Sequence, residues 1–441
     1  MRNLCSSPVF LLVASLLSPP GVLGEAYLEL GPMLGHVSST EARIWAKASG
    51  EARLSVRVSE QIDPGSGRTE RGSMLSAASD FMGHVRATRL KPSTRYFYRV
   101  LLDGKPAMLP PFPSFVTAPP EGSSGRLRFA FISCSGRNGY DAAAGYADLA
   151  ARTNVDLLLM LGDNHYADST DRAKQRPAYY DQRRQPGFRM LTERIPTYAI
   201  WDDHDYGPND SDGSATGKEI SLQTFQQFWA NPAYGRANNP GVHFKFSRGD
   251  VDFFMLDNRY HRSTNSAPDD GTKTMLGREQ LAWLKGELAA SKAKIKFVAS
   301  GSSWQTHGTG DSWTSFDRER REIWKFIEGR GIRGVIFLSG DRHFTAGYQV
   351  QGKWIEITSG PIGSSNAKTK NTPEMFLHYN EGKLYCVFDV DTTASEPKVA
   401  LEIYRAGQGL LERRAFTWDE INGIAKMPAL PPSPDEPARA Q

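Results

Sequence analysis

The sequence predicts a small all-β sandwich that is followed by a larger α/β domain. In residues 26–118, short segments alternate apolar and polar side chains and are separated by turn residues, as in a β-sandwich. In residues 126–426, strand-length runs are apolar throughout, and amphipathic segments of helical length separate several of them. Because strands of continuous apolar character are covered on both faces, the second pattern predicts a layered α/β domain.

The composition is that of a globular protein. Of the 441 residues, 39% are hydrophobic, 11% aromatic and 23% charged, which excludes a fully disordered or fibrous chain. The formal net charge of +4 arises from 53 basic and 49 acidic residues without a long Lys/Arg block, so the sequence carries no nucleic-acid-binding signature. The three cysteines, at positions 5, 134 and 386, are too few for a disulfide framework.

Residues 1–24 have the pattern of a signal peptide. Arg2 precedes the apolar stretch Val9–Leu17, and small or apolar residues stand shortly before Glu25. This stretch is shorter than the roughly 20 apolar residues that span a bilayer, and no later segment reaches that length without charges, so no transmembrane segment is expected. The alternative, a buried N-terminal helix, is disfavoured because Pro19 and Pro20 interrupt the pattern. We therefore expect an exported protein, periplasmic or secreted.

Residues 26–118 are expected to form a fibronectin type III-like sandwich. Ala42–Ala46 and Tyr96–Val100 show the alternation that is typical of strands. The segment Leu90–Tyr98 resembles the tyrosine-bearing turn of fibronectin type III-like domains, in which the ring packs over a sheet corner. The run Pro119–Gly125 is rich in Pro, Gly and Ser, and we expect it to link this domain to the next.

Residues 126–426 are expected to form the strands and helices of the α/β domain. The apolar strand-length runs are Phe129–Ile132, Leu157–Leu161, Phe253–Leu256, Phe297–Ala299 and Val335–Leu338. The expected helices include Arg278–Ala290 and Asp317–Glu328, and two later strands, Leu384–Phe388 and Val399–Tyr404, should extend the core sheets. The tail, residues 427–441, contains five prolines without periodicity and is expected to be disordered.

Polar residues follow each of the five apolar strands. The segments are Ser133–Ser135, Gly162–Tyr166, Asp257–Arg259, Gly301–Ser303 and Gly340–His343. In open α/β sheets, ligands bind at the carboxyl ends of the strands. The five segments are therefore expected to converge on one pocket.

The segment around Asp163 has the residue types of a metal site. A carboxylate at the end of a buried strand can bridge two cations, and the phenolate of Tyr166 suits a hard ion such as Fe(III). Further along, Asp203 can bind metal and leave the adjacent His204 free to protonate a leaving group. Taken alone, each of these residues also has an ordinary interpretation, since Asp commonly caps turns and helices and His and Tyr are common in cores.

Two further segments complete the candidate metal site. Asp341 and His343 are two residues apart, so their side chains leave an extended strand end on the same side. Cys134 follows a strand, whereas a packing thiol more often lies inside one. Taken alone, Cys134 would be interpreted as a buried packing residue, because free cysteine is among the most buried residue types. Its occurrence together with the other segments favours metal binding.

The motifs GDNHY, DDHD and GDRH resemble those of the metallophosphoesterase superfamily, whose purple acid phosphatase branch carries GDxxY, GNH(D/E) and GHxH. Together with Cys134, WDDHD, the LDNRYHR stretch at Leu256–Arg262 and LGREQ at Leu276–Gln280, they are similar to the alkaline phosphatase D (PhoD-like) branch. This resemblance spans roughly Tyr27–Tyr404. It implies a four-layer αββα catalytic domain, a mixed site of Fe(III) and calcium or other divalent metals, and hydrolysis of phosphate mono- and diesters.

The resemblance also implies a role for each matching residue. Iron would be held by Cys134, Asp163, Tyr166 and His343. Calcium would be held by Asp163, Asp203 and Asp341, with Asn209 as a further candidate. His204 would act on the leaving group, and Arg259 and Arg137 would contact the phosphoryl group, although Arg259 could instead pair with an aspartate such as Asp257. A middle histidine of the superfamily has no clear match, which favours calcium because that ion prefers oxygen ligands.

These residues together predict an exported phosphoester hydrolase in which a metal-activated hydroxide attacks phosphorus. One alternative is a strict phosphodiesterase that acts on phospholipid or cell-wall polymer esters. Another is an exported binding protein without catalysis. An inactive relative would be expected to lose the bridging carboxylate or the DDHD histidine, and both Asp163 and His204 are present.

Overall fold

The structure is a computed structural model that describes residues 25–431 except 138–140, 153 and 306–309. The expected signal peptide, residues 1–24, and residues 432–441 of the tail lie outside the described residues. Within the described part of the chain, no helix is both long and apolar enough to cross a membrane.

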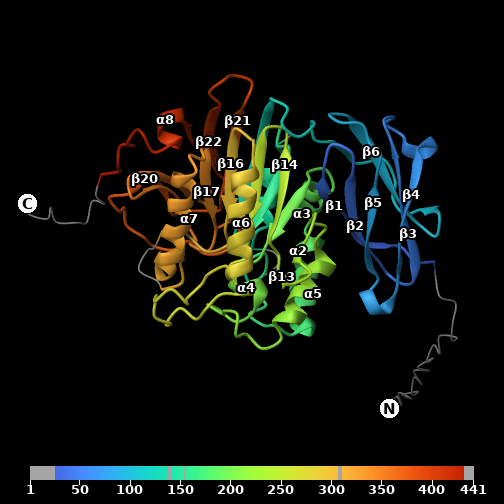
Figure 1. Ribbon diagram of the computed structural model, residues 1–441. Coiled ribbons are helices and arrows are strands. Elements are labelled where there is room, and N and C mark those ends of the chain that lie inside the picture. The colour runs from blue at the N-terminus through green and yellow to red at the C-terminus, as the bar shows by residue number, and fades with distance from the viewer. Residues whose placement is uncertain (1–24, 138–140, 153, 306–309, 432–441) are drawn as a thin grey trace, which may run out of the picture.

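The N-terminal part is an all-β sandwich of two sheets (Figure 1). The first sheet has the order β1 (Leu28–Val37), β2 (Ala42–Ala48) and β5 (Met82–Ala87). The second contains β4 (Arg68–Leu75), β3 (Ala52–Ser59), β6 (Arg95–Leu102), β7 (Lys105–Pro106) and β8 (Ser114–Val116), and two short 3-10 helices, η1 (Pro64–Ser66) and η2 (Ala77–Ser79), connect strands. Tyr96 Oη accepts a hydrogen bond of 3.0 Å from the backbone N–H of Lys91, so this ring holds the turn that precedes β6.

Two central sheets form the larger part of the molecule. The six-stranded sheet has the order β11 (Thr197–Ile200), β10 (Leu157–Leu161), β9 (Arg126–Ile132), β21 (Leu384–Asp391), β22 (Lys398–Arg405) and β23 (Gly409–Phe416). The seven-stranded sheet has the order β14 (Phe244–Arg248), β15 (Val251–Met255), β16 (Ile295–Ala299), β17 (Val335–Ser339), β19 (Trp354–Thr358), β18 (Thr345–Val350) and β20 (Met375–Tyr379). A short ribbon pairs β12 (Gly235–Arg236) with β13 (Asn239–Pro240).

Helices cover the two central sheets. They are α1 (Ala143–Ala150), α2 (Arg172–Arg184), α3 (Pro186–Thr192), α4 (Asp203–Tyr206), α5 (Lys218–Phe228), α6 (Arg278–Ala290), α7 (Asp317–Gly329) and α8 (Trp418–Ile421), with a 3-10 turn, η3 (Trp313–Phe316), before α7. In Figure 1, α6 and α7 lie over the seven-stranded sheet, and α2, α3 and α5 lie toward the front sandwich.

The apolar strands explain this layering. Phe129 of the six-stranded sheet lies 5.0 Å from Phe253 and 4.7 Å from Phe297 of the other sheet, measured between ring centroids, so the sheets pack face to face. Phe254 points to the opposite face and packs in the cluster that contains Trp283 of α6. Successive residues of β15 thus face different layers, which is why this strand is apolar throughout. The result is the four-layer αββα sandwich that the family resemblance implies.

The front sandwich is tied to the helices of the α/β part. Trp45 Nε1 donates a 2.7 Å hydrogen bond to the carbonyl of Gln227, and Tyr98 Oη donates one of the same length to the carbonyl of Glu193. The backbone N–H of His36 donates to Ala230. These hydrogen bonds position the sandwich against α3 and α5.

The tail differs in part from the expectation of disorder beginning at residue 427. The backbone N–H of Met427 donates to Gln349 Oε1, and that of Leu430 donates to the carbonyl of Met375. Leu430 also packs against the cluster beneath α6 and α7. Met427 and Leu430 are therefore held on the domain by partners that periodicity alone does not reveal.

Candidate metal centre

The strand topology brings the polar segments to one edge. Strands β9, β10 and β11 are parallel neighbours, as are β15, β16 and β17 in the second sheet. Their carboxyl ends therefore lie at the same edge of each sheet. Cys134, Asp163 and Asp203 follow the ends of the first three strands, and Asp341 and His343 follow β17.

The backbone is constrained at these positions. Cys134, Asp163, Asp341 and His343 have positive φ values of 58°, 51°, 69° and 56°. Such left-handed conformations are uncommon for residues with a side chain and gather at functional sites, where the surrounding fold enforces them. Gly162 shares this conformation, with a φ of 91°, and a Cβ atom there would also lie 2.6 Å from the backbone nitrogen of Asp202. The loops after β10 and β11 therefore touch.

Four of the expected iron ligands form a contiguous group. Tyr166 Oη lies 3.1 Å from Asp163 Oδ2 and 2.9 Å from His343 Nε2, and Cys134 Sγ lies 3.6 Å from Asp163 Oδ2. Ser364 Oγ donates a 2.9 Å hydrogen bond to Tyr166 Oη. The donor atoms of Cys134, Asp163 and His343 all lie within 4.8 Å of one another, which is close enough to share one ion.

A second group shares Asp163 with the first. Ligand atoms of Asp163, Asp203 and His204 lie within 4.8 Å of one another, and so do those of Asp202, Asp203 and Asp341. Asp163 Oδ1 is buried and finds no hydrogen-bond donor among the residues that the structure describes. An unpaired carboxylate oxygen in a buried acidic cluster is costly unless a cation neutralises it. The donor set therefore fits bound metal, with Asp163 between two groups.

The pKa values of Asp163, Cys134 and Tyr166 agree with a site that binds metal. Burial, and then the charges of Cys134 and Asp203, raise the pKa of Asp163 well above its usual range. Burial is also the main reason that the pKa of Cys134 rises to about 12 and that of Tyr166 rises well above its usual value. Since thiolate, phenolate and carboxylate are the metal-binding forms, a multivalent cation would favour the ionisation that burial opposes.

His204 lies beside the first group with its ring oriented by a carboxylate. Its Nδ1 makes a short hydrogen bond to Asp168, and its ring centroid lies 4.0 Å from that of Tyr166. Arg137, which is largely exposed, donates a 2.8 Å hydrogen bond to the other oxygen of Asp168. Because Nδ1 of His204 is hydrogen-bonded to Asp168, its other ring nitrogen, Nε2, is the one that can exchange a proton with a substrate.

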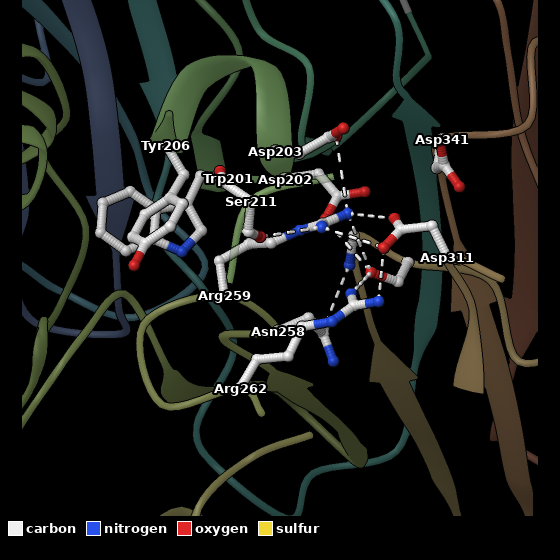
Figure 2. A network of polar contacts seen from close by, with 12 residues as sticks. Trp201, Asp202, Asp203, Tyr206, Ser211, Asn258, Arg259, Arg262, Asp311 and Asp341 are labelled. Carbon is white, nitrogen blue, oxygen red and sulfur yellow. Dashed lines mark hydrogen bonds and ion pairs between the residues drawn. The ribbon is translucent and has the colours of Figure 1, made fainter. Parts of the chain in front are cut away.

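Arg259, for which a phosphoryl contact and an aspartate partner were both expected, contacts aspartates in this structure. Figure 2 shows its guanidinium between aspartates, and its side chain is wholly buried. Nε lies 2.5 Å from Asp202 Oδ1, and Nη2 lies 2.7 Å from Asp311 Oδ2 and 3.5 Å from Asp203 Oδ1. The Arg259 guanidinium does not pair with Asp257. Asp257 Oδ1 accepts the backbone N–H of Arg259, together with Trp201 Nε1 and the backbone N–H of Tyr260. The contacts make Arg259 a positioning residue that holds the aspartates of the second group.

Replacing Arg259 by methionine is expected to lower the free energy of unfolding by about 3–5 kcal/mol, because it leaves the buried Asp202 without its arginine partner and leaves Asp311 with Arg262 alone. Denaturant unfolding measures this loss. The matched control is Arg278→Met, since the Arg278 side chain is 94% exposed, and it should change stability by less than about 0.5 kcal/mol. Equal stabilities of the two variants would contradict the role of Arg259.

Asn209 is exposed, whereas the neighbouring Asp210 approaches the second group. Ligand atoms of Asp203, Asp210 and Asp311 lie within 4.8 Å of one another, and the backbone N–H of Asp210 donates to Asp203 Oδ2 at 2.8 Å. The loop after α4 therefore presents Asp210 as an additional carboxylate beside the position expected for calcium.

Sequence reasoning did not single out Asp168, Asp202 or Asp311. Asp168 lies two residues beyond Tyr166, so its proximity to the GDNHY motif was an available signal. Asp202 lies inside the WDDHD motif, where either aspartate could have been chosen. Asp311 lies 12 residues beyond the end of the predicted strand Phe297–Ala299, outside the polar segment that follows it, and only the folded chain brings it to Arg259.

Comparisons with known proteins agree with this architecture. The curated relatives include alkaline phosphatase D of Bacillus subtilis, which is 26% identical over 314 residues covering 59% of this chain and 53% of that protein. Purple acid phosphatase 23 of Arabidopsis thaliana is 27% identical over 275 residues, which cover 57% and 54% of the two chains. The chain thus spans about half the length of the curated relatives that it matches.

Solved structures show the same fold. A structure of PhoD aligns with a TM-score of 0.71 at 19% identity and covers 93% of this chain and 95% of that one. The purple acid phosphatase PPD1 of yellow lupin (Lupinus luteus) aligns with a TM-score of 0.67 at 13% identity, covering 90% and 75%.

Two family profiles match different parts of the chain. Residues 25–119 match a domain of unknown function. Residues 129–413, more than half of the chain, match the PhoD-like phosphatase profile. This chain belongs to the PhoD-like phosphatase family.

Proposed function

We propose that the protein is an exported, metal-dependent phosphoester hydrolase of the alkaline phosphatase and phosphodiesterase type. The observation that carries this proposal is the buried Asp163, which shares one group with Cys134 and His343 and another with Asp203 and His204. The family membership of the α/β part supports the same reaction class. We further propose the division into a signal peptide at 1–24, a sandwich domain at 26–118, a catalytic domain at 126–426 and a tail at 427–441.

The two groups differ in the metal that they favour. The first offers the thiol of Cys134, the phenol of Tyr166, the imidazole of His343 and the carboxylate of Asp163, a set suited to Fe(III). The second offers the oxygens of Asp163, Asp203 and Asp341, which suit calcium, and Asn209 remains a further candidate ligand there. When bound, the two cations would supply Lewis acidity for the phosphoryl group and for the attacking water.

The protein's own side chains would orient the substrate and move a proton. His204, held through Nδ1 by Asp168, can give a proton from its other nitrogen to the departing ester oxygen. Arg137 stands at the exposed side of the same Asp168 and can donate to phosphoryl oxygens. Arg259 keeps Asp202 and Asp203 in place rather than meeting the substrate.

The purified holoprotein is expected to absorb visible light, because phenolate and thiolate ligands of Fe(III) give charge-transfer bands. Tyr166→Phe should shift or remove the band, whereas Tyr27→Phe, at an exposed position of the front sandwich, should leave it unchanged. Absorption spectra with metal analysis, together with rates on a phosphomonoester and a phosphodiester, test the proposal. A colourless, iron-free protein of full activity would overturn the assignment of iron, and absence of activity on both esters would overturn the proposed reaction.

A further inference from the structure

A second polar cavity lies between the front sandwich and the α/β part, away from the metal centre. Its volume is about 380 Å³, and strands β6 and β8 line it through Arg95 and Ser114–Val116. On the other side it is lined by residues that include Asp156, Pro196 and Arg248. Both parts of the molecule therefore contribute to this cavity.

The cavity and the metal centre lie at opposite ends of the same strands. Asp156 directly precedes β10 and Pro196 directly precedes β11, whereas Asp163 and Asp203 follow the ends of those strands. A five-residue strand such as β10 spans roughly 17 Å at about 3.3 Å per residue. A ligand in this cavity would therefore not touch the metal-binding side chains.

Arg248 is a buried cation that makes no side-chain hydrogen bond or ion pair with the residues that the structure describes, although the negative charge of Asp156 acts on it from farther away. Arg248 is 6% exposed, and its Nε and Nη1 atoms find no hydrogen-bond acceptor among the residues that the structure describes. A buried charge is normally paired, because leaving it unpaired costs several kcal/mol. The Arg248 guanidinium therefore belongs to a residue that lines the cavity, and its hydrogen-bonding capacity is not used by the described residues.

The other charged residues that line the cavity are mostly arginines. Arg95, Arg152 and Arg194 also line it, and Asp156 is its one acidic lining residue besides four arginines. Arg152 is engaged by Asp148 at 3.0 Å, and Asp156 accepts the backbone N–H of Arg128 at 2.8 Å. Arg95 makes a 3.2 Å hydrogen bond to Ser114 Oγ through Nη1 only, which leaves its other donors. The cavity therefore has an excess of positive charge on both walls.

We propose that this cavity binds a small phosphate-class oxyanion, either inorganic phosphate or a small phosphomonoester, with Arg248 as the anchor and Arg95 as the contact from the front sandwich. The planar guanidinium presents parallel N–H donors that match two oxygens of such an anion. The anion would connect the sandwich to the α/β part. This proposal is independent of the phosphoester hydrolysis proposed above.

The test measures binding of labelled inorganic phosphate to the holoprotein by equilibrium dialysis. The parent, Asp163→Asn, Arg248→Met and Arg278→Met are compared at constant ionic strength, with Arg278→Met as the exposed-arginine control. We expect Asp163→Asn to keep this phosphate site and Arg248→Met to bind one equivalent less than the parent. Equal stoichiometry in parent and Arg248→Met, or no phosphate bound to Asp163→Asn, would overturn the proposal.

A second variant, Arg95→Met, tests the site even if Arg248→Met does not fold. Arg95 is exposed, so Arg95→Met should fold normally and weaken phosphate binding at this site roughly tenfold. Unchanged affinity in Arg95→Met would contradict the contact from the sandwich. Competition by phenylphosphonate, which is not hydrolysed, would identify the site as open to monoesters, and its failure would restrict the site to inorganic phosphate. Displacement of phosphate by an equal concentration of chloride would contradict an oxyanion site.

Discussion

Asp163→Asn is expected to abolish hydrolysis and to remove both cations from the purified protein. Asp163 is the one residue that the two candidate groups with Cys134 and Asp203 share, so one substitution weakens both. An amide also lacks the negative charge that holds a multivalent ion. We expect the rate on a phosphomonoester to fall by at least about 10³-fold, with iron and calcium lost in parallel. Metal analysis and initial rates measure both effects.

The free energy of unfolding of Asp163→Asn shows whether the variant loses activity because it loses metal or because it fails to fold. Burial and neighbouring negative charges raise the pKa of Asp163, so its ionised form is unfavourable in the folded chain without cations. Asp163→Asn should therefore be at least as stable as the parent after chelation. Asp181→Asn, a half-exposed carboxylate on α2, is the matched control and should keep metal and rate. Near-normal metal content and rate in Asp163→Asn would show that the carboxylate is not a bridge.

His204→Ala is expected to reduce turnover by roughly 10²- to 10⁴-fold while iron and calcium stay near the parent stoichiometry. The reason is that Asp168 holds the ring through Nδ1, which leaves the other nitrogen to protonate the departing oxygen. The deficit should shrink for substrates such as nitrophenyl phosphate, whose leaving group departs without a proton. Rates on a series of leaving groups, together with metal analysis, measure both parts of the prediction.

The alternative role of His204 is metal binding, since its ligand atom also lies within 4.8 Å of those of Asp163 and Asp203. In that case His204→Ala would lose metal in parallel with activity and would be equally impaired on every leaving group. Asp168→Asn provides a companion test, because it preserves the size of the side chain that orients the ring. It should reproduce part of the His204→Ala deficit and the same dependence on leaving group.

Strongly patterned segments were the most predictable part of the fold. The strand Leu157–Leu161 and the helix Arg278–Ala290 have the predicted bounds. A strand that is buried on both faces appears in the sequence as a continuous apolar run, and an amphipathic helix appears as apolar residues that recur every three to four positions. The convergence of the polar segments also follows from sequence, since parallel strands end at one edge. The first residues of the tail were mispredicted, because Leu430 is held by a partner far away in sequence.

The side-chain partners at the site were less predictable than its location. Sequence spacing placed Arg259 near the pocket, but its burial between Asp202 and Asp311 depends on a loop that reaches the site only in the folded chain. Asp168 likewise meets His204 of α4, from which it is separated by 36 positions in the sequence. Such pairings are set by tertiary packing, for which a single sequence carries no local pattern.

The most direct test of a metal-dependent hydrolase centred on Asp163 is a chelation and restoration titration that follows bound metal and phosphoester hydrolysis in the same samples. The account predicts that activity falls with the loss of two cations per chain and returns as iron and calcium are added back to the parent, but not to Asp163→Asn. Full hydrolysis by metal-free protein, or restoration of Asp163→Asn to the parent rate, would contradict it.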